Sequence, residues 1–415
     1  MYKLINSFII LLFIATINLY SQDSSLSASY LRICPSAANN AIGGAGVALP
    51  LNNAFGLFFN PAFSAVNDHE NTIKIGMNLV DTYPFQENVV KLAISGSLDL
   101  SRFYKSIPLS IGLGFMKQKV ELETATYVDE GWSVRIEHHL NRNWANTFNF
   151  SVSWNDLIKA GLGFNFKTIS YEYYPTYNSN PSNQQNEFAF DFGAFIAYPI
   201  FTRKNLFQDY KLDFDIAIGG SVTNIGDGLY FTRSRQVDYK IIVEKIQYPF
   251  PRTIKIGYSI NSGIERKFLD SEYKFISLNW TAEVEDLLLK WNKDTLYYKS
   301  VAGNINPLNN LILLKSEGTV KVRFGARLGL FESLYLSYGR MNTGNLKNMN
   351  TYGISFHTDG IVRFLDNVYN ISNYSQILKY LSIRYNFASL TDIGSTSILN
   401  QYGYYHGIDF IIRIF

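Results

Sequence analysis

The segment TVKVRFGARLGL, residues Thr319–Leu330, alternates apolar and polar side chains along its length. Its even-numbered positions are apolar, whereas its odd-numbered positions carry Lys321, Arg323 and Arg327 among small residues. A strand that crosses an outer membrane at a tilt needs about 9–11 residues, and a typical strand in globular proteins has about 5–6. The length and the period of two therefore predict a membrane-spanning strand whose apolar face meets lipid and whose charges line a lumen.

The same alternation recurs along most of the chain, in about fifteen segments. Single-chain bacterial barrels have an even number of strands, so we expect a closed, all-β, antiparallel transmembrane barrel of about 14 strands, with about 16 as the alternative. Residues Ala282–Trp291 (AEVEDLLLKW) interrupt the rhythm and favour a short helix. The clearest further strand segments are Asn71–Val80, Val90–Leu100, Ile107–Phe115 and Trp144–Trp154.

The composition agrees with a barrel in a membrane. Of the 415 residues, 47% are apolar and 16% aromatic, which excludes a disordered chain. Charged residues make up 17%, below the roughly 25% that is usual in soluble domains. Lys and Arg total 37 against 34 Asp and Glu, and this near balance provides no basic surface for nucleic acid.

The order of the sequence features along the chain predicts that the protein has three parts. Residues 1–21 read as a secretory signal peptide, because Lys3 precedes the apolar run Leu4–Leu19 and Ser21 is small enough for cleavage. An uncleaved anchor helix is the alternative, but the run is shorter than the about 20 apolar residues that span a bilayer. We expect residues 22–70 to form an N-terminal plug and residues 71–415 the barrel, located in the outer membrane of a Gram-negative cell.

Small residues near the start of the mature chain favour a plug. Side chains as small as those of Gly43, Gly44, Ala45 and Gly46 cannot fill a lipid-facing wall, and glycine allows close backbone approach. A compact segment of this kind fits inside a barrel. The glycines lack the G-x-G-x-x-G spacing and a strand–helix setting, so a dinucleotide site is excluded.

A second signal is the tripeptide Asn60, Pro61 and Ala62. Proline restricts the residue before it to an extended or turn conformation and removes a backbone donor. That combination suits a bend where the plug meets the first strand, with an ordinary turn as the alternative.

Residues with catalytic or metal-binding chemistry are scarce. The chain has five histidines and one cysteine, Cys34, and their spacing matches no metal-binding pattern. No constellation of nucleophile, base and acid is apparent either. The sequence therefore predicts a protein that is not an enzyme, with no metal and no cofactor.

Residues Leu31–Asn67 resemble the N-terminal segment of FadL-type outer-membrane barrels, especially their PorV/PorQ branch. The shared elements are a Gly-Gly pair, Val-Ala, an aromatic and Asn-Pro-Ala, and later matches follow in order at Gly220–Tyr258 and Val322–Gly339. The segment departs from the branch pattern at Asn40, Ile42, Asn52 and Asn53. The resemblance implies a 14-stranded barrel with a plug.

The resemblance implies two functions. A PorV/PorQ-like protein is a component of type IX protein secretion, with the secretion translocon and cargo C-terminal domains as partners. The alternative is a FadL-like transporter for hydrophobic small molecules such as long-chain fatty acids, in contact with outer-membrane lipid and able to hold a hydrophobic ligand or detergent. In that case the plug movement opens the route, and the ligand pocket is formed by Phe55, Leu57, Phe58 and Phe59.

Overall fold

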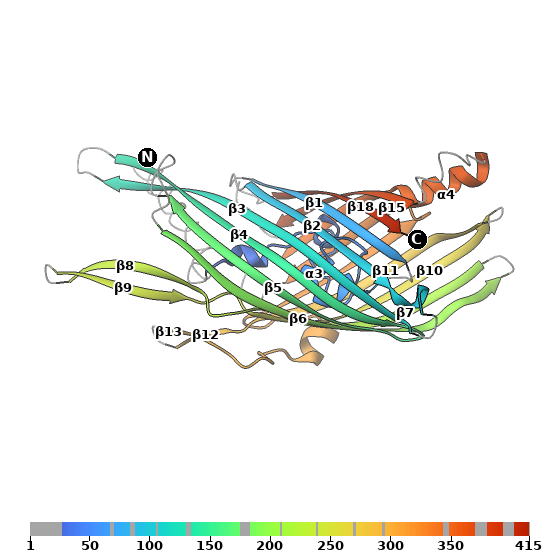
Figure 1. Cartoon of the computed structure of the whole chain (residues 1–415), viewed down its shortest axis with the longest axis horizontal. Coiled ribbons are helices and arrows are strands. Elements are labelled where there is room, and N and C mark those ends of the chain that lie inside the picture. Colours follow the sequence, from blue (N-terminus) through green and yellow to red (C-terminus); the bar gives the residue numbers. More distant parts are fainter. Residues whose placement is uncertain are drawn as a thin grey trace, which may run out of the picture.

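In the part of the chain that the structure describes, fourteen antiparallel strands close into a barrel (Figure 1). The first strand, β1 (Asn71–Tyr83), pairs with the last, β18 (Tyr402–Ile414), so that Asn71 faces Ile414 and no open sheet edge is left in the wall. This computed structural model describes residues 27–66, 70–83, 88–104, 107–129, 134–174, 183–207, 210–237, 240–268, 271–292, 295–342, 348–369, 380–392 and 402–414. The predicted signal peptide, residues 1–21, lies outside the described residues.

Neighbouring wall strands follow the chain order, with two excursions that leave the wall. The excursions are the hairpins β8–β9 (Leu229–Val237 and Lys240–Tyr248) and β12–β13 (Leu289–Asn292 and Thr295–Tyr298). The remaining wall strands are β2 (Asn88–Asp99), β3 (Leu109–Asp129), β4 (Val134–Asn155), β5 (Lys159–Tyr174), β6 (Asn183–Phe207), β7 (Tyr210–Ile225), β10 (Thr253–Phe268), β11 (Ser271–Leu287), β14 (Val320–Leu330), β15 (Leu334–Asn342), β16 (Met349–His357) and β17 (Leu381–Asp392).

The wall alternates as the sequence predicts. Leu113 and Leu162 point outward and are 61% and 62% exposed, whereas polar residues of the opposite parity are buried in the interior. A closed barrel satisfies every wall hydrogen bond without an edge, and an apolar exterior is stable only in lipid. The predicted fold class and the outer-membrane location are confirmed. No helix among the described residues is long and apolar enough to cross a membrane.

The two ends of the barrel differ in their connections. Short turns join β4 to β5, β6 to β7, β10 to β11 and β14 to β15, at the end where β1 begins and β18 finishes. The excursions β8–β9 and β12–β13 leave from the other end. Outer-membrane barrels have short periplasmic turns and longer extracellular loops, so the first end is periplasmic.

Two expectations about local structure are wrong. Residues Ala282–Trp291 are not helical, because Ala282 pairs with Tyr258 of β10 and with Phe324 of β14, and ladder bonds on both sides outweigh the helical propensity. Val320 and Val322 do not meet lipid. The extracellular loop with the short π-helix η4 (Pro307–Ile312) folds over the barrel exterior, and Ile305, Leu311 and Leu314 cover them.

Candidate functional site

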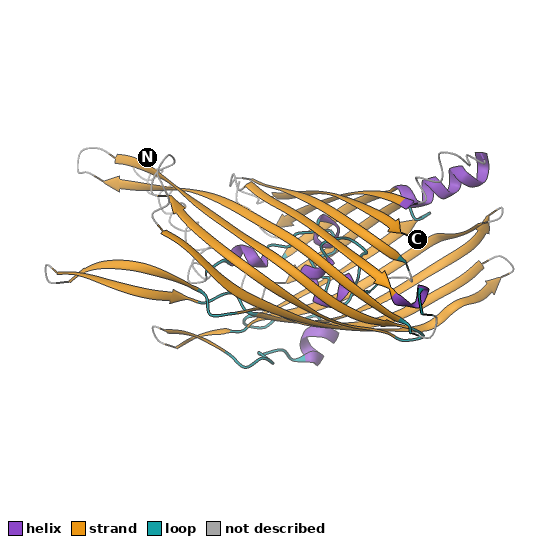
Figure 2. Cartoon of the chain, viewed as in Figure 1, coloured by secondary structure: helices purple, strands orange, loops and turns teal. Residues whose placement is uncertain are grey.

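Residues 27–66 pass through the barrel interior from the extracellular to the periplasmic end. At the extracellular end the Ser27 hydroxyl donates to the Tyr248 carbonyl over 2.6 Å, next to the base of β9. The segment contains only short helical turns: η1 (Ser29–Arg32), α2 (Ala37–Asn40), α3 (Gly56–Phe59) and η2 (Pro61–Ser64). Figure 2 shows these turns within the ring of strands. We call residues 27–66 the plug.

Glycines in the wall let the plug backbone approach closely. A methyl group at Gly219 would overlap the Val47 carbonyl, and one at Gly163 would overlap the carbonyl of Pro61. At Gly325 it would lie 2.6 Å from the Ile42 carbonyl oxygen. The plug main chain therefore lies directly on the wall, held by a surface that only glycine provides.

The predicted plug-motif residues all lie in this buried segment. Gly43 and Gly44 adopt φ angles of 76° and 72°, which glycine alone accommodates readily, where the chain leaves α2. Gly43 donates to the Thr351 hydroxyl over 2.9 Å. Ala45 carries only a methyl group, and a Cβ at Gly46 would overlap the Phe59 ring.

Asn60, Pro61 and Ala62 form the bend that leads out of the lumen. The Asn60 amide donates to the carbonyls of Val47 and of Ala194, over 2.9 and 2.8 Å, so it ties two parts of the chain together. Its oxygen accepts from the Ala62 backbone at 3.1 Å and caps η2, which has Pro61 in its first turn. The motif thus sets the end of the plug.

The predicted lumen charges Arg323 and Arg327 have partners on the wall. Arg323 pairs with Glu283 and Glu285 of β11 over 3.0 and 2.7 Å. Arg327 lies 3.2 Å from a His357 ring nitrogen and 4.0 Å from the centre of the Tyr335 ring. Lys321 is half-buried, and it lies directly opposite Glu285 of β11 in the strand register.

Glu283 connects this wall cluster to the plug. One of its oxygens accepts from the backbone nitrogens of Gly46 and Val47, each over 2.8 Å, while the other accepts from Arg323. The side chain is fully buried. A charged acceptor that serves two backbone donors fixes the small-residue turn of the plug against β11.

Two further inner-wall lysines, Lys91 and Lys167, were not predicted as site residues from the sequence. The Lys91 ammonium group is fully buried and donates to the carbonyls of Ile33 and Cys34, over 3.0 Å each. Lys167 pairs with Asp191 over 2.8 Å. The sequence signal that could have identified them is a lysine at a lumen-facing position of a predicted strand whose other lumen-facing residues are small.

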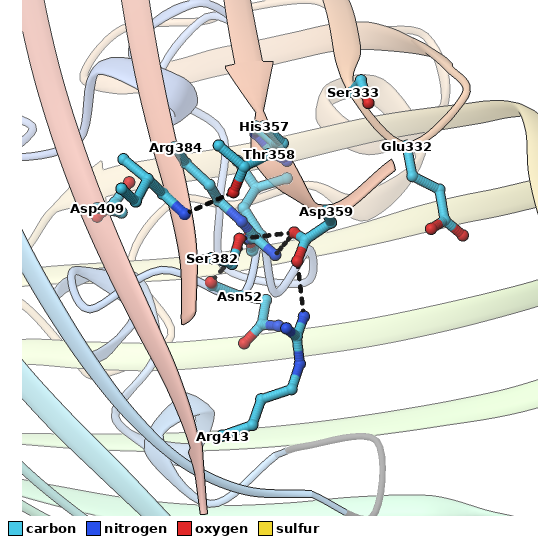
Figure 3. A network of polar contacts seen from close by, with 12 residues as sticks. Asn52, Glu332, Ser333, His357, Thr358, Asp359, Ser382, Arg384, Asp409 and Arg413 are labelled. Atoms are coloured by element: carbon cyan, nitrogen blue, oxygen red, sulfur yellow. Dashed lines mark hydrogen bonds and ion pairs between the residues drawn. The ribbon is translucent and has the colours of Figure 1, made fainter. Parts of the chain in front are cut away.

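A polar network joins the plug to the periplasmic rim (Figure 3). Arg384 of β17 donates to the carbonyls of Leu51 and Asn52 in the plug, over 3.4 and 3.1 Å. It also pairs at 3.3 Å with Asp359, in the first turn of helix α4 (Thr358–Tyr369), and Asp359 pairs at 2.9 Å with Arg413. Burial acts to raise the pKa of the Asp359 carboxyl, but the two guanidinium groups outweigh it and hold that pKa below its usual range.

Phe55, Leu57, Phe58 and Phe59 are brought together as a packed cluster. All four are at most 7% exposed, and they lie against Ala93 and Met116 of the wall. The rings of Phe58 and Phe59 meet edge to face at 5.1 Å. None of the four lines the larger cavity described next, so their role as a ligand pocket stays a prediction.

A cavity of about 540 Å³ lies between the plug and the periplasmic half of the wall. Its lining mixes aromatic and aliphatic side chains with charged side chains of both signs, among them Lys74, Asp213 and Lys274. Phe63 and Phe195 meet edge to face at 5.2 Å in its wall. The apolar lining residues include Leu51, Phe63, Val66, Leu157, Phe195, Ala197, Phe201 and Phe214.

The wall beside the cavity is irregular. The β6–β7 register shifts between Pro199 and Phe201, again between Phe201 and Lys204, and again between Asn205 and Phe207. Pro199 has no backbone donor, and Arg203 adopts a φ angle of 48°. Bulges and proline interrupt ladder bonds, so this is a weakened part of the wall.

Several solved transport proteins are similar in structure. The toluene transporter TodX of Pseudomonas putida has 10% identity and a TM-score of 0.44, covering 91% of this chain and 97% of that chain. The monoaromatic hydrocarbon channel CymD has 10% identity and a TM-score of 0.45 (92% and 98%), and a Pseudomonas aeruginosa FadL homologue has 11% and 0.38 (91% and 97%). No protein-family model and no curated protein matches. With TM-scores below 0.5, these likenesses assign no ligand to this chain.

No group of three His, Cys, Asp or Glu side chains within the described residues could hold a metal ion. Many polar groups inside the barrel, such as Glu283, Lys91 and Asn165, instead bond to the plug backbone. The cavity has room for a small molecule.

Proposed function

We propose that this protein carries small hydrophobic molecules across the outer membrane, with the cavity of about 540 Å³ as their binding site. The cavity supports this proposal because its volume falls in the range of about 300–1,000 Å³ that is usual for small-molecule sites. Its aromatic and aliphatic lining suits a monoaromatic or aliphatic hydrocarbon. Among the charged lining residues, Lys74 and Lys274 suit the carboxylate of an amphiphile such as a long-chain fatty acid.

Passage through the barrel needs a movement of the plug, because the plug residues above the cavity are almost completely buried. The weakened β6–β7 wall offers a lateral way between cavity and lipid, since Phe201 lines the cavity and is also 37% exposed. An apolar ligand has a lower free energy in lipid than in water, so a route that opens from the cavity directly into lipid favours its passage.

Filling the cavity is expected to reduce transport. Ala197 lines it and is 9% exposed, so Ala197→Phe places a ring inside, whereas Ala194→Phe on the same strand places one in lipid. In a transport-deficient host, we expect Ala197→Phe to lower the uptake of a radiolabelled hydrocarbon and fatty acid by about fivefold or more, and Ala194→Phe to leave it within about twofold. Equal uptake by both variants at equal surface levels would contradict the proposal.

A second candidate is the PorV/PorQ-like role in type IX secretion. It is favoured by the hairpin β8–β9, which forms a sheet of its own and stands away from the barrel (Figure 1). The free edges of such a sheet can accept a strand from a cargo domain. In a host with this secretion system, replacing residues 232–245 with a short turn keeps Leu229 and the Tyr248 carbonyl that hold the plug at Ser27. The change should then abolish surface attachment of cargo and leave hydrocarbon uptake intact. Normal cargo attachment would dismiss this role.

A further inference from the structure

Helix α4 is attached to the barrel by its charged side. Asp359 forms the ion pairs with Arg384 and Arg413, and Arg363, one turn later, pairs with Glu332 of the β14–β15 turn over 2.7 Å. Gly360 packs so closely on this turn that a methyl group there would overlap the Phe331 carbonyl. Three ion pairs and a glycine contact therefore fix the orientation of the first two helical turns.

The apolar side of α4 faces away from the protein. Ile361, Phe364 and Leu365 are 52%, 47% and 37% exposed, and the spacing of three and four residues places them on one helix face. A surface helix of a water-soluble protein turns this face inward and its charges outward. The reversed orientation in α4 is favourable only where its surroundings are apolar.

The start of α4 lies at the level of the membrane boundary. The strands β15 and β16 have 9 residues each, the minimum of about 9–11 with which a tilted strand crosses the hydrocarbon region. α4 follows β16 directly, and with a rise of 1.5 Å per residue Leu365 lies within about 10 Å of the helix start. The headgroup layer and the acyl boundary occupy this depth.

The exposed face continues the lipid-facing surface of the barrel. Phe356, the last outward residue of β16, is 50% exposed, Phe331 in the adjoining turn is 54% exposed, and Ile383 of β17 is 37% exposed. These three residues surround the base of α4, since the Thr358 hydroxyl accepts from the Ile383 backbone and His357 donates to the Ser333 carbonyl. The lipid belt and the helix face are thus neighbours.

We propose that α4 is a membrane-interface helix whose apolar face binds the phospholipids of the periplasmic leaflet. Its ion pairs connect it through Arg384 to the plug carbonyls of Leu51 and Asn52. The helix therefore supports the periplasmic end of the plug from a fixed position in the lipid headgroup layer. This binding does not depend on which molecule the barrel transports.

The depth of α4 can be measured with nitroxide labels on the full chain in nanodiscs of phosphatidylethanolamine and phosphatidylglycerol. Cys34→Ala removes the single cysteine, and heat-dependent gel migration verifies folding of each variant. Labels at Ile361→Cys and Phe364→Cys probe the apolar face, and a label at Asp366→Cys, seven residues after Asp359 on the same side of the helix, is the matched control that keeps the three ion pairs. We expect the ratio of oxygen to nickel-complex accessibility to be about threefold higher at 361 and 364 than at 366.

Two results would overturn the proposal. If all three labels are equally open to the nickel complex, the apolar face lies in water. If labels at 361 and 364 are shielded from both oxygen and the nickel complex, protein covers the face, such as a second copy of this chain. Uptake assays are not involved, so failure here is distinct from failure of the transport proposal.

Discussion

Replacing Gly219 with valine is expected to displace the plug from the wall. The new Cβ would overlap the carbonyl of Val47, and neither the plug main chain nor β7 can yield easily, because both are buried and hydrogen-bonded. Overpacking of a core costs about 1–3 kcal/mol when side chains can adjust, and a clash between backbones leaves less room for adjustment. We therefore expect a barrel that still inserts but holds its plug loosely.

The displaced plug should be detectable as a leak. Ion conductance of the purified protein in planar bilayers should rise well above that of the unmodified protein, and cells should become sensitive to large antibiotics that do not otherwise enter. Gly220→Val is the matched control, because the adjacent position has no atom nearer than 3.6 Å to an added Cβ. If both variants conduct alike, close contact with the wall does not hold the plug.

The alternation along Thr319–Leu330 predicts the strand, its parity and its inward arginines, because period two is imposed by the strand itself. It does not predict that Val320 and Val322 are covered from outside, because the covering residues Ile305, Leu311 and Leu314 belong to the preceding loop, and alternation within a strand does not determine where the adjoining loop folds. Ala282–Trp291 shows the same limit: its local propensity is helical, and only the two neighbouring strands make it a strand.

The candidate site was predicted in part, for a similar reason. Small residues indicate a segment that packs inside the barrel, and the plug motif lies there. Aromatic residues in that segment do not reveal whether they border empty space. Phe58 and Phe59 pack against each other and the wall, whereas Phe63 borders the cavity together with Phe195 from β6. A cavity forms where side chains from segments far apart in sequence do not fill the space between them, and no local sequence pattern encodes this.

Replacing Glu283 with alanine is expected to cause the largest loss of stability among single changes in the wall cluster. The substitution leaves the backbone nitrogens of Gly46 and Val47 without their acceptor and removes one of two carboxylates from Arg323. Breaking a buried charge pair costs about 3–5 kcal/mol, and each orphaned buried donor adds about 1–3 kcal/mol. Because the structure relaxes, we expect a decrease of about 3–5 kcal/mol in the free energy of unfolding, measured by urea titration in lipid vesicles.

Two variants separate the plug contact from a general effect of charge. Glu283→Gln keeps an oxygen acceptor for the plug but loses the charge, so it should retain part of the stability. Glu121→Gln removes a carboxylate that pairs with Lys119 and Arg142 at the surface, where such pairs contribute about 0–1 kcal/mol. Proteolysis between residues 43 and 48 should increase in Glu283→Ala alone, since only that variant frees the turn. A different result would contradict this expectation: the free energies of unfolding of Glu283→Ala and Glu121→Gln differ by less than about 1 kcal/mol. In that case packing against the wall glycines holds the plug, and the Glu283 carboxylate serves only to neutralise Arg323.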